Sequence, residues 1–140
     1  MQTQLHPYLS FRDNTRQAME FYQSVFGGEL TINTYKEFNA SEDPTEDDKV
    51  MHAMLVANSG ITFMAADTPK SIELKIGDNF SLTLNGDNEE ELRGYWQKLL
   101  EGGRQTMPLD KAPWGDTFGM LIDQFGIHWM VDITPRQAQV

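Results

Sequence analysis

Residues 54–64 have the sequence MLVANSGITFM, and residues 120–130, which lie 66 positions further on (54 to 120), have the sequence MLIDQFGIHWM. Five of the eleven aligned positions are identical, the two terminal methionines among them. In both copies a turn that contains a glycine separates two apolar runs, which is typical of a β-hairpin. Because such a similar hairpin sequence occurs twice, we expect the chain to contain one structural unit twice.

An amphipathic helix is expected ahead of each hairpin, over residues 15–26 and 89–101. Each segment follows an Asp-Asn pair whose asparagine, Asn14 or Asn88, is a favourable helix cap, and each ends at a Gly-Gly pair, which stops a helix. Apolar side chains recur at helical spacing and form one stripe on each segment. The stripes consist of Ala18, Phe21, Tyr22, Val25 and Phe26 in the first helix and of Leu92, Trp96, Leu99 and Leu100 in the second.

The other apolar segments alternate with polar residues or are rich in β-branched and aromatic residues, which predicts strands. They are residues 5–11, 29–36, 50–57, 61–66, 80–84, 105–109, 117–123 and 127–133. The order strand, helix, three strands therefore occurs twice, in modules of about residues 1–70 and 71–140. We expect an α+β fold of one domain, residues 1–140, in which two βαβββ modules pair into a curved mixed sheet with the helices outside and a concave groove inside.

Composition and charge narrow the class of protein. The 140 residues include 21 acidic and 11 basic side chains, a formal net charge of −10, and no cysteine, so disulfides, thiolate metal ligands and a cysteine nucleophile are excluded. The acidic balance argues against nucleic acid and against an anionic membrane as partners. No apolar run approaches the roughly 20 residues that cross a bilayer, and the N-terminus lacks the layout of a signal peptide, so we expect a soluble cytoplasmic protein.

Much of the acidic charge lies in two short runs, residues 42–48 and 87–91. The first run contains Pro44 and repels itself, which favours a solvated loop. A calcium-binding loop is the alternative, but the run lacks the alternating oxygen ligands and the central glycine of such loops. The second run opens the expected helix of residues 89–101, where carboxylates stabilise the positive end of the helix dipole.

Together these features resemble a known family. The doubled strand-helix-three-strand unit is similar to the glyoxalase/bleomycin-resistance/dioxygenase superfamily, also called vicinal oxygen chelate proteins. Several short motifs resemble its PhnB-like branch, whose members carry the description 3-demethylubiquinone-9 3-methyltransferase. The motifs are YLSF (8–11), AMEFY (18–22), FGGEL (26–30), VMHA (50–53), MAAD (64–67), PWG (113–115) and DQFGIHW (123–129).

Superfamily members that use a metal hold it with His, Glu or Gln at four strand positions, two from each repeat. Alignment of the strands with this pattern places the first position at His6, the second at Met64 and the fourth at Met130. The third falls at Phe80 if the Asp-Asn pairs are aligned, and at Asn79 if the core-facing leucines are aligned. Because a thioether is a poor ligand for hard divalent ions, we expect no metal site of the family type and no cofactor.

The expected groove is lined by alternate residues of the strands, because the side chains of a strand point to opposite faces in turn. Trp114 is either a lid over this groove or a hydrophobic plug. The three histidines, His6, His52 and His128, either line a wet cleft or form a three-imidazole metal site. No catalytic residue is assigned, and the expected ligand-binding residues are His6, Tyr8, Ser10, His52, Met64, Asn79, Ser81, Trp114, His128 and Met130.

Thioethers, a phenol, imidazoles and hydroxyls suit a small organic ligand that is partly aromatic or amphipathic, so we expect a small-molecule-binding protein. The first alternative is a lyase, isomerase or dioxygenase of the same superfamily, which uses either a non-standard metal site or groove side chains. In that case His6 or His128 would be the general base and Tyr8 the general acid. The second alternative is a structural protein without a dedicated ligand. The resemblance implies a homodimer.

Overall fold

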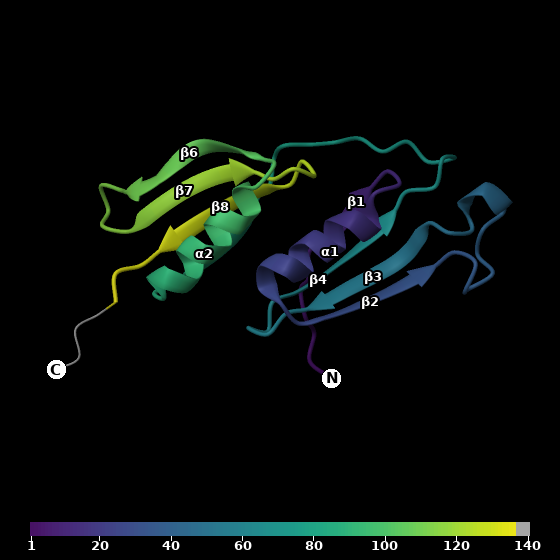
Figure 1. Ribbon diagram of the computed structural model, residues 1–140, viewed down its shortest axis with the longest axis horizontal. Helices are drawn as coiled ribbons and strands as arrows, with labels where there is room; N and C mark the ends of the chain where they lie inside the picture. Colours follow the sequence, from purple (N-terminus) through teal and green to yellow (C-terminus); the bar gives the residue numbers. More distant parts are fainter. Residues whose placement is uncertain (137–140) are drawn as a thin grey trace. The chain divides into compact units, whose positions relative to one another are not determined.

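Two units follow one another along the chain in the computed structural model, which describes residues 1–136 (Figure 1). The first unit spans Met1–Ile76 and the second begins at Gly77. Each contains one strand, one α-helix and three further strands, so the α+β class and the doubled βαβββ unit are confirmed. Residues 137–140 of the expected second module lie outside the described residues. No helix within residues 1–136 is both long and apolar enough to cross a membrane.

The two units have the same order of elements. The first comprises β1 (Tyr8–Phe11), α1 (Thr15–Phe26), β2 (Glu29–Thr34), a short 3-10 helix η1 (Pro44–Glu46), β3 (Val50–Val56) and β4 (Thr62–Asp67). The second comprises β5 (Leu82–Gly86), α2 (Glu89–Leu100), β6 (Arg104–Lys111), β7 (Thr117–Ile122) and β8 (His128–Ile133).

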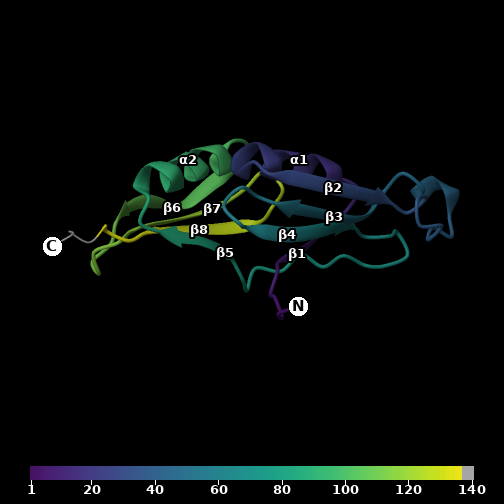
Figure 2. The ribbon, with the colours of Figure 1, turned by 90° about the horizontal axis from the view of Figure 1, so that it is seen from below.

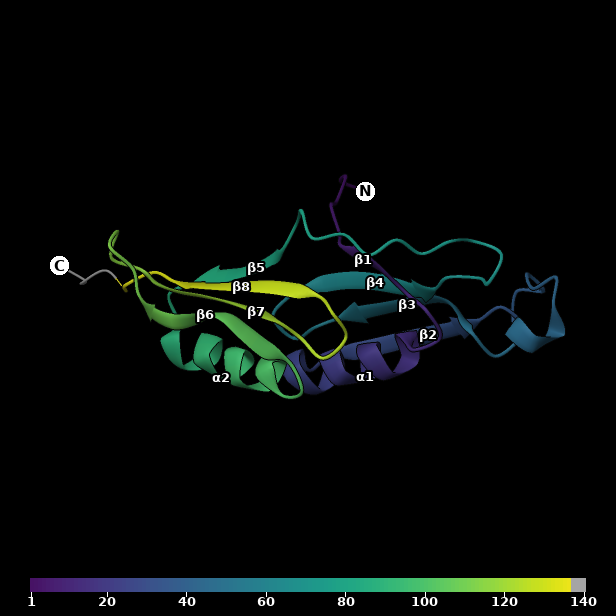
Figure 3. The same ribbon diagram turned by 90° about the horizontal axis from the view of Figure 1, so that it is seen from above.

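Each unit contains one mixed four-stranded sheet, with strand order β1-β4-β3-β2 in the first and β5-β8-β7-β6 in the second. The first and last strands of a unit pair in parallel, and the other pairs are antiparallel. In each unit the α-helix lies against one face of its sheet (Figure 2, Figure 3). Within residues 1–136 no α-helix of the same unit covers the opposite face.

Strand alternation and the helix stripes build the core of each unit. In β1, β4 and β8 every second residue is buried. Phe63 of β4 lies edge-on to Tyr22 and Phe26 of α1, with ring centroids 5.3 and 6.2 Å apart. The predicted stripes are confirmed except at Phe21 and Leu100, which are only half-buried. The buried apolar side chains include Leu9, Phe11, Ala18, Met19, Tyr22, Val25, Phe26, Leu55, Phe63 and Ala65 in the first unit and Leu84, Leu92, Trp96, Leu99, Leu121, Trp129 and Val131 in the second.

The start of α1 depends on a carboxylate that lies 52 residues further along the chain. The helix begins at Thr15 as predicted, but the side chain of Asn14 makes no capping hydrogen bond. Instead the buried Asp67, at the end of β4, accepts a hydrogen bond from Thr15 N through Oδ1 (3.0 Å) and one from Val50 N through Oδ2 (2.9 Å). The second helix follows the prediction, because Asn88 Oδ1 accepts from a backbone N–H of its first turn (3.1 Å).

The first strand of each unit begins later than predicted. β1 begins at Tyr8 rather than at Leu5, because Pro7 has no N–H to donate and the Leu5 side chain is exposed. β5 begins at Leu82 rather than at Phe80, whose side chain is also exposed. β6 is longer than predicted, because it pairs with β7 from end to end in spite of two irregularities in its register.

The acidic run of residues 42–48 is only partly a solvated loop. Glu42 and Asp48 are exposed, as predicted. Glu46, however, is only 6% exposed, and its Oε1 accepts a hydrogen bond from Lys70 N (2.8 Å). Asp43 forms an ion pair with Lys70 Nζ, which holds the pKa of this carboxyl well below its usual range. The prediction of a wholly solvated loop was therefore wrong, because a segment 24 residues away supplies partners for Glu46.

Candidate functional site

Each sheet has one face that its own helix leaves uncovered, and we call it the open face of that unit. On the open face of the first unit lie the side chains that alternate with buried ones, Tyr8 and Ser10 in β1 and Met64 in β4. The corresponding side chains of β8 in the second unit are His128 and Met130. These five are partly or largely exposed to solvent. Their role in ligand binding stays a prediction.

Three of the predicted residues come together on the open face of the first unit. His52 Nε2 lies 3.4 Å from Met64 Sδ, across the paired strands β3 and β4. The ring centroid of Tyr8 lies 6.1 Å from that of His52, and the two planes are tilted by 52°. Burial raises the pKa of the Tyr8 phenol, so it stays protonated at neutral pH and presents an O–H donor. A phenol, an imidazole and a thioether therefore adjoin one another at a surface that solvent can reach.

Sequence reasoning missed the neighbours of this cluster. The register of β2 and β3 places Asn33 opposite His52 and Thr31 opposite Met54. Met54 is in turn the Cα partner of Met64. These neighbours add polar side chains and a second thioether to the same face. The alternation within residues 29–36, a segment already predicted as a strand, was the signal that could have found the two polar residues.

On the open face of the second unit, three thioethers lie in one row across the sheet. The register places Met120 opposite Met130, and Met107 opposite Met120. Met130 is also the partner of Thr83 in β5. His128 precedes Met130 by two residues on β8 and therefore shares its face. Within residues 1–136, no interaction joins the imidazole of His128 to these thioethers in the way that His52 contacts Met64.

Trp114 lies in the turn between β6 and β7. Ala112 N donates to the carbonyl of Asp116 (2.7 Å), and Gly115 N donates to the carbonyl of Ala112 (3.0 Å). The indole is 64% exposed and contacts the Phe118 ring edge-on, with centroids 5.9 Å apart. Trp114 is therefore not a plug in the core of its own unit, because the short turn holds it at the surface. A lid function stays a prediction.

A pair of carboxyl groups lies beside this turn and was not foreseen. Asp132, on β8, is the Cα partner of Phe118, and its Oδ1 is buried without a hydrogen-bond partner. Burial raises the pKa of Asp132, and the neighbouring carboxyl of Asp116 raises it further. Alternation with Met130 places Asp132 on the open face.

Replacing Asp132 with asparagine is expected to stabilise the protein at pH 7 by less than about 1 kcal/mol, because Asp132 and Asp116 are only partly buried as residues. The pKa of Asp132 is higher in the folded chain than in the unfolded chain, so the ionised carboxylate costs stability above the folded-state pKa. That cost shrinks as the pH falls through the folded-state pKa and disappears only below the unfolded-state pKa of about 4, where the carboxyl is protonated in both states. Urea unfolding at pH 7 and pH 4 measures the difference. Asp78→Asn, at an exposed position, is the control, and an equal gain there would contradict the prediction.

The remaining predicted residues lie outside this cluster. The pairings of Tyr8 with Met64 and of Thr83 with Met130 are equivalent in the two units, so the residue equivalent to His6 is Ser81. The register therefore rules out both earlier placements of the third family position, Asn79 and Phe80. A short strand with irregular ends carries too little pattern to fix its register. Asn79 and Ser81 precede β5, as His6 precedes β1.

The residues at the four family positions do not fit a hard divalent ion. They are His6 and Met64 in the first unit and Ser81 and Met130 in the second. Such ions prefer several nitrogen and oxygen donors, and two thioethers with one hydroxyl are a poor substitute. We therefore assign no metal-dependent chemistry to these positions. The three-imidazole alternative stays a prediction.

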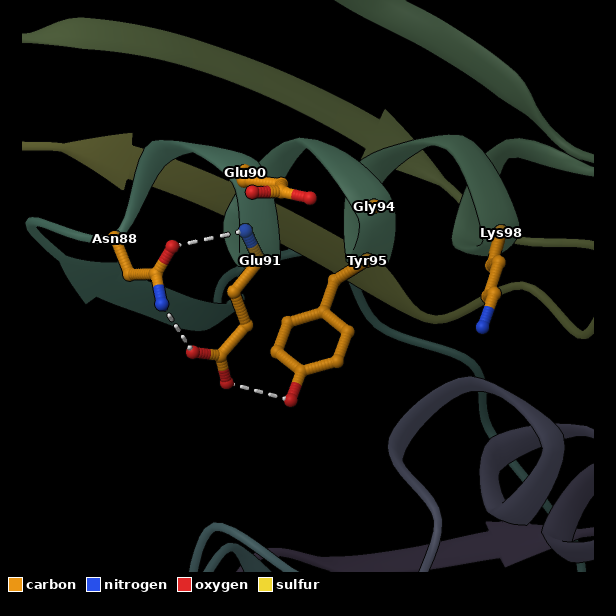
Figure 4. Close-up of a pocket in the computed structure, with 6 residues that line it drawn as sticks. All are labelled: Asn88, Glu90, Glu91, Gly94, Tyr95 and Lys98. Atoms are coloured by element: carbon orange, nitrogen blue, oxygen red, sulfur yellow. Dashed lines mark hydrogen bonds between the residues drawn. The ribbon is translucent and has the colours of Figure 1, made fainter.

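A depression of about 400 Å³ lies beside α2 and offers a different surface (Figure 4). Its side chains come from that helix and its N-cap, and three of them pair with each other. Asn88 Nδ2 donates to Glu91 Oε2 (3.2 Å), and Tyr95 OH donates to Glu91 Oε1 (2.7 Å). None of the predicted site residues lines it. Its lining is charged and comes from one helix and its cap, which makes it the weaker candidate for an organic ligand.

Known proteins resemble this chain over nearly its whole length. The sequence model of the family described as 3-demethylubiquinone-9 3-methyltransferase matches residues 3–132. Protein PA1353 from Pseudomonas aeruginosa is 35% identical, with a TM-score of 0.81 over 96% of this chain and 100% of that one. A putative 3-demethylubiquinone-9 3-methyltransferase, PhnB protein, from Bacillus cereus is 28% identical, with a TM-score of 0.76 over 94% and 100%. A glyoxalase-related enzyme from Fulvimarina pelagi, 17% identical, shares the fold with a TM-score of 0.63 over 96% and 89%.

Proposed function

The chain belongs to the family described as 3-demethylubiquinone-9 3-methyltransferase, within the vicinal oxygen chelate superfamily, and from this premise we propose that it binds a small organic molecule on the open faces of its sheets. The observation that carries the proposal is the cluster of Tyr8, His52 and Met64, whose side chains adjoin at a solvent-accessible surface. A face that the helix of its own unit leaves uncovered, and that has this chemistry, is available for a ligand to cover.

The side chains define the class of ligand. Thioethers and an aromatic ring contact an apolar or aromatic skeleton, and a methionine side chain adapts to its shape. The protonated Tyr8 hydroxyl and the side chain of Asn33 supply hydrogen bonds that orient polar substituents. The ligand is therefore partly aromatic or amphipathic, and the net charge of −10 favours a neutral or cationic molecule over an anion. Binding uses no metal at the family positions, since their donors do not suit a hard ion.

A matched pair of tyrosine variants tests the site. We expect some members of a panel of monocyclic phenols and aromatic amines to raise the melting temperature of the wild-type protein. Tyr8→Ala should weaken the binding of these compounds about tenfold, as removal of an aromatic contact residue commonly does. Tyr95→Ala, which removes the α2 ring that lines the depression, should leave the affinities unchanged. Isothermal titration calorimetry measures the affinities of both variants. A loss of affinity confined to Tyr95→Ala would contradict the proposal and indicate that the ligand binds in the α2 depression.

We propose further that the chain acts in the cytoplasm as a homodimer and that its two units work as one domain. The support is the resemblance to the superfamily together with the absence of cysteine, which suits a reducing compartment. Light scattering after gel filtration measures the oligomeric state.

A further inference from the structure

We propose that His52, Met64 and Met54 form a binding site for the soft ion Cu(I) on the open face of the first unit. The site goes beyond the proposed function, because the ion is held by two neighbouring strands of one sheet and needs no organic ligand. It shares only Met64 with the four family metal positions, which draw on both repeats.

Two of the donor atoms already lie at a distance at which one ion can bind both. His52 Nε2 and Met64 Sδ lie 3.4 Å apart. Metal–nitrogen and metal–sulfur bonds of about 2.0 and 2.3 Å, as d¹⁰ Zn²⁺ forms them, span this gap when they meet at an angle of roughly 105°. That angle is close to the tetrahedral value. An ion can therefore join both atoms without a change in the strands.

Met54 supplies the third donor. It is the Cα partner of Met64 in the antiparallel pair of β3 and β4, so the two side chains leave the same face of the sheet. Directly opposed residues have Cβ atoms about 4.5–5.5 Å apart. The methionine side chain is unbranched and flexible, so its sulfur can turn towards an ion beside Met64. His52, two residues before Met54 on β3, is the diagonal neighbour of Met64.

The donor set selects the kind of ion. Thioethers are soft ligands that favour Cu(I), and hard divalent ions prefer the oxygen donors that this set lacks. The net charge of −10 attracts any cation to the protein, but it does not choose among them. Binding requires no electron transfer, and Nε2 of His52 is the nitrogen donor.

The internal repeat provides a matched control within the same chain. Met120 and Met130 have the same register in the second unit as Met54 and Met64 in the first. The residue equivalent to His52, however, is Phe118, since both lie two positions before the first methionine of their pair. The second unit therefore has the thioethers but no imidazole at the position of His52, and its own histidine, His128, lies on β8 instead.

The test is an anaerobic competition titration of the full chain, in which bicinchoninate and the protein compete for Cu(I). We expect the wild type to withhold one equivalent of Cu(I) from the chelator. Removing a direct ligand should cost at least as much affinity as removing an outer partner does, so His52→Phe and Met64→Leu should each lose about tenfold or more. Met130→Leu should retain the wild-type affinity. Both methionine variants conserve volume, so the fold should persist.

A second measurement uses Ag(I), which is redox-inert, and the methyl resonances of the eight methionines. We expect one equivalent of Ag(I) to shift the signals of Met54 and Met64 and to leave those of Met120 and Met130 in place. The proposal is overturned if the wild type withholds no Cu(I), if His52→Phe keeps full affinity, or if Met130→Leu loses as much as Met64→Leu. It is equally overturned if Ag(I) shifts the methyl signals of Met120 and Met130 before those of Met54 and Met64.

Discussion

Replacing Asp67 with alanine is expected to lower the free energy of unfolding by about 3 kcal/mol and the melting temperature by about 10 °C. The buried carboxylate accepts hydrogen bonds from Thr15 N at the start of α1 and from Val50 N at the start of β3. Alanine leaves both backbone donors buried without a partner, and each such donor costs about 1–3 kcal/mol. Urea unfolding followed by circular dichroism measures the loss.

Two further variants make this prediction specific. Asp67→Asn keeps one acceptor oxygen, so it should destabilise less than alanine does. Asp48→Ala removes the same charge from an exposed position and should change stability by no more than about 0.5 kcal/mol. If Asp67→Ala were no more destabilising than Asp48→Ala, the assignment of Asp67 as the partner that positions α1 would be wrong.

Replacing Gly28 with alanine is expected to destabilise the protein by about 3 kcal/mol or more, from backbone strain and overpacking together. Gly28 has φ +96°, and a Cβ added there would lie 2.2 Å from the carbonyl oxygen of Val56 and 2.5 Å from Cα of Ala57. Both obstacles are backbone atoms of the β3–β4 hairpin, so no side-chain rotation relieves the clash. Chemical denaturation measures the effect.

Gly60→Ala is the matched control for this variant. Gly60 has a similar φ of +87°, but a Cβ there would meet nothing within 4 Å. It should therefore cost only the conformational strain, about 1–2 kcal/mol. Equal losses for Gly28→Ala and Gly60→Ala would contradict the argument that close approach of the backbone is what requires Gly28.

The fold could be predicted to a large extent because its signals are local. The 3.6-residue stripes, the Gly-Gly stops and the repeated hairpin each depend on residues close together in sequence, and α1 was predicted with the observed bounds. The alternation expected of the strands is also observed, because every second residue of β1, β4 and β8 is buried. The weaker predictions concerned strand ends and the register of β5, where pairing with a distant strand decides.

The candidate site was less accessible to sequence reasoning. Tyr8, His52 and Met64 were each singled out, but from separate motifs and with no indication that they are neighbours. Their proximity follows from the parallel pairing of β1 with β4 and the antiparallel pairing of β3 with β4. Met54 was visible as one of the repeated methionines, yet only the register showed that it stands opposite Met64.

The sequence by itself determined the doubled βαβββ unit, the positions of both helices and the alternation that divides buried from open faces, because periodicity and turn chemistry act over a few residues. Tertiary structure alone decided which distant groups serve as partners. Asn14 occupies the cap position, yet Asp67 supplies the carboxylate, and Glu46 in a run of acidic residues is buried because Lys70 N donates to it. At Gly28, the second glycine after α1, the backbone of the β3–β4 hairpin lies where a Cβ would be, at 2.2 Å from the carbonyl oxygen of Val56. Hydrogen bonds and steric contacts of this kind join residues that are far apart in sequence. Patterns within a few residues therefore cannot predict them.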